Sequence, residues 1–169
     1  SRLVPAADVH RHGIARALIS LGWVALRSGE YQLANARLEQ ALVLSRQLED
    51  TRSMGFELSG LGEIALRLGD YARATELLEE SLELRRQLGN KWGIGVSVGT
   101  LGWVAICEED WDRAVAQLSE SLKVRQEIGD KGGCAWCLER LAEVAQAQGQ
   151  IEKAVRMLSA AAALRVSIG

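Results

Sequence analysis

The sequence is short of several residue types that would point to particular classes of protein. It has one proline, two histidines and three cysteines in 169 residues. An odd number of cysteines argues against a disulfide framework and favours a reducing compartment. The two histidines, His10 and His12, have no nucleophile pattern near them, so no catalytic site can be assembled from the sequence.

The chain also lacks an excess of positive charge and any long apolar run. Its formal net charge is −2 at pH 7, so it has no basic footprint for a phosphate backbone and nucleic-acid binding is not expected. No apolar run approaches the roughly 20 residues that a membrane-spanning helix needs. The sequence begins at Ser1 without a signal segment, and we interpret it as a cytoplasmic fragment of a longer protein.

A 40-residue repeat dominates what is present. A Leu-Gly pair returns at each step, followed after a constant interval by an alanine and then a leucine. The pairs are Leu21-Gly22, Leu61-Gly62, Leu101-Gly102 and, weakened, Leu141-Ala142. The alanines are Ala34, Ala74, Ala114 and Ala154, and the leucines are Leu38, Leu78, Leu118 and Leu158. Self-similarity of this kind indicates stacked units of secondary structure.

Each unit carries two stretches with apolar residues in steps of 3 and 4, which predicts two amphipathic helices. Short turns with glycine and aspartate separate them, as at Gly69-Asp70, because glycine ends helices and aspartate caps them. We therefore predict an all-α fold of four antiparallel hairpins, and a turn of different winding where Glu109 replaces the glycine. The repeats span about 11–50, 51–90, 91–130 and 131–169 of one domain, after a degenerate segment or repeat remnant at 1–10.

Glycines inside the predicted first helices need a compensating reason, because glycine costs about 1 kcal/mol relative to alanine there. We expect Gly22, Gly62 and Gly102 to permit a close helix crossing over the small alanines of the second helices.

These residues resemble the tetratricopeptide repeat, whose pattern has a Leu-Gly pair in the first helix and small and large residues in the second. The resemblance covers residues 11–169 and implies a right-handed αα superhelix (solenoid). Two departures concern the family's tyrosine, which is alanine here, and its helix-ending proline, which is absent, so the second helix can run on. The long units are similar to those of kinesin light chains and spindle-orientation adaptors. They are more similar still to the arrays of bacterial signal-transduction ATPases and of LuxR-type or maltose-activator-type regulators.

The resemblance implies that partners bind along the concave surface, which the first helices line. Four of the five tryptophans fall on the corresponding stripe, and tryptophan and arginine dominate binding hot spots. We expect a groove for a peptide or partner protein that carries apolar side chains and an acidic group. The alternative is that the tryptophans cover an inner wall and touch each other. The candidate contact residues are Arg16, Trp23, Arg27, Phe56, Arg67, Trp92, Trp103, Trp136 and Arg140.

The predicted function is a non-catalytic interaction or effector-sensing module without cofactor or metal. A constitutive adaptor, or a small-molecule sensor with a pocket between Trp92, Trp103 and Trp136, is the alternative. Cys134 and Cys137 have metal-ligand spacing but occupy core positions, so we interpret them as structural thiols. The charge run that includes Arg85 is interpreted as a solvated outer face. Because the last helix is not polar, either the array continues or two copies meet there.

Overall fold

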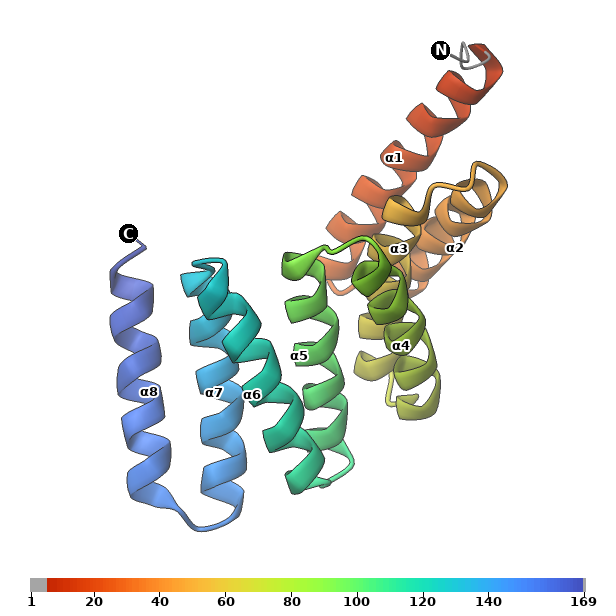
Figure 1. The fold of residues 1–169 in the computed structure, drawn as a ribbon. Helices are drawn as coiled ribbons and strands as arrows, with labels where there is room; N and C mark the ends of the chain where they lie inside the picture. Colours follow the sequence, from red (N-terminus) through yellow and green to blue (C-terminus); the bar gives the residue numbers. More distant parts are fainter. Residues whose placement is uncertain (1–5, 169) are drawn as a thin grey trace. The chain divides into compact units, whose positions relative to one another are not determined.

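All regular structure in the computed structural model, which describes residues 6–168, is helical (Figure 1). The helices are α1 (Ala6–Arg27), α2 (Tyr31–Gln47), α3 (Thr51–Arg67), α4 (Tyr71–Gln87), α5 (Lys91–Cys107), α6 (Trp111–Glu127), α7 (Lys131–Ala147) and α8 (Ile151–Val166). They pair as four antiparallel hairpins, which confirms the all-α fold predicted from the repeat. The second helices run to the residue before Leu48, Leu88 and Ile128 in the first three repeats, as expected without a helix-ending proline.

The first helix begins earlier than the repeat predicts. Residues 1–5 of the predicted degenerate segment lie outside the described range, but residues 6–10 form the first turns of α1. Residues 6–10 are therefore helical although they match the repeat poorly. His12 is also helical, and its Nδ1 lies 2.8 Å from the Asp8 carbonyl oxygen one turn earlier.

The helices form two compact units, with α1 to α4 in the first and α5 to α8 in the second. Within each unit the two first helices touch, α1 with α3 and α5 with α7. The second helix of the leading hairpin also packs on the first helix of the next one, α2 on α3 and α6 on α7. Each unit therefore presents its own pair of neighbouring first helices.

The hairpin turns share one winding, including the turn at Glu109. Gly69 has φ +83° and Glu109 has φ +58°, so both occupy the left-handed region. The Asp70 N–H donates to the Ala65 carbonyl at 2.9 Å, and the Asp110 N–H donates to the equivalent carbonyl at the same distance. Both aspartates also cap the following helix. The expectation of a differently wound turn is thus wrong, because hydrogen bonds hold Glu109 in a backbone conformation that favours glycine.

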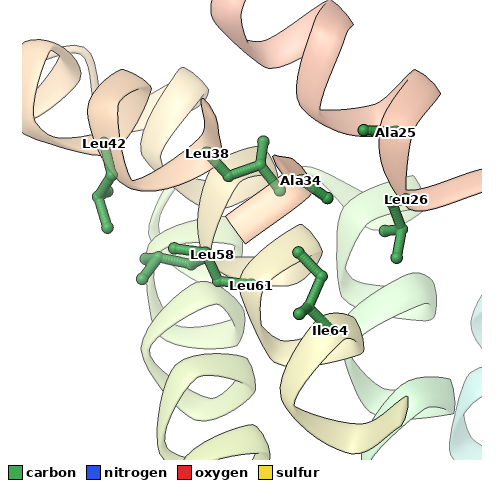
Figure 2. Close-up of a cluster of buried hydrophobic side chains, with 8 residues drawn as sticks. All are labelled: Ala25, Leu26, Ala34, Leu38, Leu42, Leu58, Leu61 and Ile64. Carbon is green, nitrogen blue, oxygen red and sulfur yellow. The ribbon is translucent and has the colours of Figure 1, made fainter. Parts of the chain in front are cut away.

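Close crossings in the core explain the helical glycines. A Cβ on Gly22 would lie 2.7 Å from Leu38 Cγ, and a Cβ on Gly60 of α3 would lie 2.5 Å from Leu38 Cδ1. Leu38 is fully buried between these two glycines. Figure 2 shows it beside Ala34, in the cluster that α2 shares with Leu58, Leu61 and Ile64 of α3. The close crossing is confirmed, although the nearest contact is the leucine instead of the expected alanine.

Candidate functional site

Three predicted contact residues of the first unit line one open pocket. Trp23, Arg27 and Arg67 face a volume of about 390 Å³ near the ends of α1 and α3. Tyr31 and Glu63 lie in the same lining, and neither was among the predicted contacts. Glu63 belongs to the same helical stripe, so its spacing could have identified it. Tyr31 could not be found in this way, because it opens a second helix.

Arg67 is held in a fixed orientation at this pocket. Its Nε and Nη2 donate to Glu63 Oε1 at 3.0 and 2.8 Å, and it also hydrogen-bonds the Tyr31 side chain. Partial burial opposes its charge, but the bonds and attraction from Glu63, with help from Tyr31, outweigh burial and raise the pKa of Arg67. Arg67 therefore stays cationic in a defined position.

Arg27 gives the pocket its second positive charge. Its side chain is exposed, and it has no ion pair among residues 6–168. Two guanidinium groups consequently face one carboxylate, that of Glu63, around the same volume. Such an excess favours an anionic group of a ligand, since guanidinium pairs with carboxylate through charge-assisted hydrogen bonds.

Trp23 belongs both to the pocket and to the core. It is partly buried and packs against the apolar cluster of α1, α2 and α3. A Cβ on Gly60 would lie 3.4 Å from Trp23 Cζ2, so the indole covers this glycine. Trp23 therefore combines the two interpretations weighed for the tryptophans, because one part of its ring packs inward while it also lines the pocket.

Phe56 and Arg16 are not in this pocket lining. The Phe56 ring lies 5.2 Å below the guanidinium carbon of Arg85, a distance typical of a cation–π contact. Arg85 is buried, and its Nη2 donates to the Gly55 carbonyl at 2.8 Å. The interpretation of Arg85 as part of a solvated face is therefore wrong, and burial lowers its pKa to about 10. Arg16 is exposed on α1.

Three predicted residues of the second unit form a separate cluster. The rings of Trp103 and Trp136 meet edge to face, with centroids 6.3 Å apart and planes at 74°. The guanidinium carbon of Arg140 lies 5.8 Å from the Trp103 ring centroid, and its Nη2 contacts Glu143 Oε1 at 2.8 Å. Burial and the neighbouring Glu139 raise the pKa of Glu143, while Arg140 opposes this rise.

Trp92 lies apart from this cluster along the helix axis. It is close to the start of α5 and about half exposed. Trp103 follows 11 residues later on the same helix, which corresponds to about 16 Å of helical rise. The structure thus brings Trp103 and Trp136 together, whereas Trp92 is three turns away.

A buried acid, Glu57, was missed by the sequence reasoning. It lies fully buried on α3, where its Oε1 accepts a 2.7 Å hydrogen bond from the Ser45 hydroxyl of α2. Its other carboxylate oxygen has no hydrogen-bond partner among the described residues. Burial raises the pKa of Glu57 to about 7, although the Ser45 bond partly opposes this rise.

Two of the three cysteines, Cys134 and Cys137, occupy the core positions predicted for them. Cys134 and Cys137 are buried and Cys107 is exposed. Burial raises the pKa of Cys134 and of Cys137, so both stay protonated at neutral pH and behave as core thiols. In residues 6–168 no group of three or more side chains is arranged to hold a metal ion. No helix within this range is long and apolar enough to span a membrane.

Comparisons with known proteins agree with this geometry. Tetratricopeptide repeat models match residues 17–52, 57–127 and 100–165. No curated protein matches the chain.

Solved structures show the same fold at low sequence identity. BtubC (BKLC) from P. vanneervenii has 23% identity and a TM-score of 0.77 over 91% of this chain and 64% of its own. The apo form of RapI has 15% identity and a TM-score of 0.81, over 92% and 57%. MamA has 18% identity and a TM-score of 0.64, over 90% and 79%. The chain thus spans less than two thirds of the first two structures. The repeat pattern, the hairpins and the matched models together show that the chain belongs to the tetratricopeptide repeat family.

Proposed function

We propose that the chain is a non-catalytic interaction module that binds a peptide segment of a partner protein along its first helices. Members of this family typically mediate protein and peptide binding. The observation that supports this most strongly is the gathering of tryptophan and arginine at two places. These are the pocket of Trp23, Arg27 and Arg67 in the first unit and the cluster of Trp103, Trp136 and Arg140 in the second.

The chemistry of the two places favours a segment with apolar side chains and at least one acidic group. The indoles offer large apolar contacts of the kind that anchor interfaces. Arg27 and Arg67 outnumber Glu63 at the pocket, so an added carboxylate balances the charge there. In the second unit Glu143 already pairs with Arg140, so the apolar contact carries more of the binding at that cluster.

A regulatory role extends this proposal. The 40-residue units are similar to the arrays of bacterial signal-transduction regulators, in which binding would bias the activity of other domains. We propose such an effector-sensing role in the cytoplasm and regard a constitutive adaptor as its alternative. A second copy of the chain is proposed as a further partner, bound at α8.

Calorimetric titration with a matched pair of peptides tests the binding proposal. One peptide alternates apolar and acidic residues, and the other carries lysine in place of each acid. We expect the acidic peptide to bind more tightly, and preference for the basic one would overturn the proposal. Arg27→Gln should weaken binding of the acidic peptide about tenfold, an effect within the range of one charge-assisted hydrogen bond. Arg37→Gln, on α2 and outside the pocket lining, is the control and should leave affinity unchanged.

Trp103→Ala separates a contact residue from a packing residue. If Trp103 contacts the partner, this variant loses affinity while its melting temperature stays close to that of the parent. A fall in melting temperature with unchanged affinity would instead assign Trp103 to the wall of the second unit.

A further inference from the structure

The first helix exposes an apolar face that the later repeats bury. Leu21 is 55% exposed, whereas its equivalents Leu61, Leu101 and Leu141 are 2%, 5% and 6% exposed. Val24 is likewise exposed, while the residues at its position in the next three repeats are buried. Ile14 lies on the same face and is exposed too. Within each unit this face packs on the second helix of the preceding hairpin, as α3 packs on α2 and α7 packs on α6.

The last helix, α8, exposes the face that corresponds to the other side of this contact, the side that α2 provides in the first unit. Leu158 is 48% exposed, whereas Leu38, Leu78 and Leu118 at its position are fully buried. Ile151 and Val155 lie on the same side of α8 and are also exposed. Apolar side chains that are exposed together on one face of a helix indicate an interaction surface.

These two faces are both apolar and hold the repeat positions of two surfaces that pack on each other in the first unit. In the first unit Leu38 of α2 inserts against Gly60 of α3 and contacts the cluster with Leu61 and Ile64. The face of α8 around Leu158 is the repeat equivalent of this α2 surface. The face of α1 around Leu21 is the repeat equivalent of the α3 surface. A contact between α8 and α1 therefore brings together the same kind of apolar faces, with Leu158 opposite Ser20 at the position that Gly60 holds in α3.

Charge at the edge of this contact is also compatible. Between second helices of the first unit, Glu39 pairs with Arg73 at 3.2 Å and Arg46 pairs with Glu80 at 3.1 Å. If α8 of one copy stacks on α2 of a second copy in the same way, Ser159 takes the place of Glu39 and faces Leu33 in the place of Arg73. Val166 likewise takes the place of Arg46 and faces Gln40 in the place of Glu80. All four side chains are uncharged, and Val166 and Leu33 are exposed apolar residues. At these two pairs of positions the contact therefore brings apolar surface together and places no charged side chain.

We propose that the chain binds a second copy head to tail, with the Leu158 face of α8 packed on the Leu21 face of α1 of the second copy. The inference rests on the self-association proposed above and identifies the opposing surface. Because the two surfaces differ, the contact is heterologous, and each copy keeps one free face for a further copy.

Mixing two variants tests this arrangement by analytical ultracentrifugation. One variant carries Leu21→Glu and Val24→Glu and loses the α1 face. The other carries Val155→Glu and Leu158→Glu and loses the α8 face. The parent should gain mass with concentration and pass beyond a dimer, while each variant alone stays monomeric. An equimolar mixture should give a dimer and nothing larger.

Each alternative occupant has a distinct result. If two α8 helices meet symmetrically, the α1-face variant still dimerises alone and the mixture adds no new species, which overturns the head-to-tail contact but keeps self-association. A parent that stays monomeric at about 0.5 mM overturns self-association itself. Val43→Glu changes an exposed apolar residue of α2 outside both faces and should associate like the parent. Circular dichroism of every variant should show unchanged helix content.

Discussion

The Ser45 hydroxyl donates a 2.7 Å hydrogen bond to Glu57 Oε1 in a fully buried seam between α2 and α3. One hydrogen bond does not offset the loss of water around a carboxylate, so burial raises the pKa of Glu57 to about 7. The protonated acid is therefore the form that the folded chain prefers at mildly acidic pH.

This preference makes stability depend on pH. The folded pKa of Glu57 lies above the unfolded value of 4.5, so its stabilising effect is complete below about pH 4.5 and is lost as the pH rises through 7. The free energy of unfolding should fall by up to about 3 kcal/mol over this window. Urea unfolding of Glu57→Gln should show a flatter dependence between pH 5 and 8. Glu79→Gln, exposed on α4, should keep the parent's slope, and an equal slope for Glu57→Gln would contradict the assignment.

Glu109→Gly should stabilise the second unit. Glu109 has φ +58°, a conformation that costs a residue with a Cβ roughly 1–2 kcal/mol, part of which is offset by the greater freedom of glycine when unfolded. We expect a net gain of about 0.5–1 kcal/mol in chemical unfolding. Gly149→Ala makes the reverse change at a turn with φ +74° and should destabilise. A loss of stability in Glu109→Gly would show that the glutamate side chain contributes a contact that outweighs the strain.

Gly62→Ala should destabilise the first unit although alanine is the better helix former. Its Cβ would lie 2.7 Å from Leu78 Cγ and 3.4 Å from the Ala74 carbonyl, and overpacking of this kind costs about 1–3 kcal/mol. Gly13→Ala is the matched control, because a Cβ at Gly13 of α1 meets nothing within 4 Å. It should instead stabilise by roughly 0.5–1 kcal/mol. Similar melting-temperature shifts for both variants would refute the close crossing.

Gly133 accommodates a buried arginine. Arg125 Nη1 donates to Asp130 Oδ2 at 2.6 Å, and its Nε donates to the Ser121 hydroxyl at 3.1 Å. A Cβ on Gly133 would clash with this guanidinium. Gly133→Ala should therefore destabilise by about 1–3 kcal/mol, whereas Gly132→Ala, whose Cβ would make only ordinary van der Waals contacts with Asp130 and Ile168, should have little effect.

A double-mutant cycle measures this coupling. Arg125→Ala alone should destabilise because it leaves Asp130 without its ion pair. The added effect of Gly133→Ala should shrink in that background, since the clashing group is gone. Strictly additive losses would mean that the two residues do not interact.

The repeat spacing was sufficient to predict the helices and their pairing, because Leu38 and its equivalents recur at one interval and face the same kind of neighbour each time. Turn residues were predictable for a similar reason. The conformation of Glu109 was not, since the hydrogen bonds of the whole turn outweigh the preference of one residue. Residues 6–10 escaped prediction because helix α1 continues past the start of the repeat pattern.

The candidate site was predictable only in part. The stripe contains Trp23, Arg27 and Arg67, which line one pocket at neighbouring first helices. Tyr31 comes from a second helix, and the stripe held no signal for it. Arg85 was predicted to face solvent because its neighbours in the sequence are charged. Gly55 has no side chain, however, and this leaves room for the Arg85 side chain to pack inward. Whether a partner binds at these residues stays a prediction.

Leu38 touches a glycine of its own hairpin and a glycine of the following hairpin. A single side chain thereby packs both within its own hairpin, against α1, and on the next hairpin, against α3. The 40-residue spacing sets the distance along the chain between such leucines. Duplication or loss of one whole 40-residue block in the gene keeps the spacing between successive leucines and helical glycines, whereas an insertion of any other length does not. Tandem arrays of this design can therefore lengthen or shorten during evolution in steps of one block while their folded state is preserved.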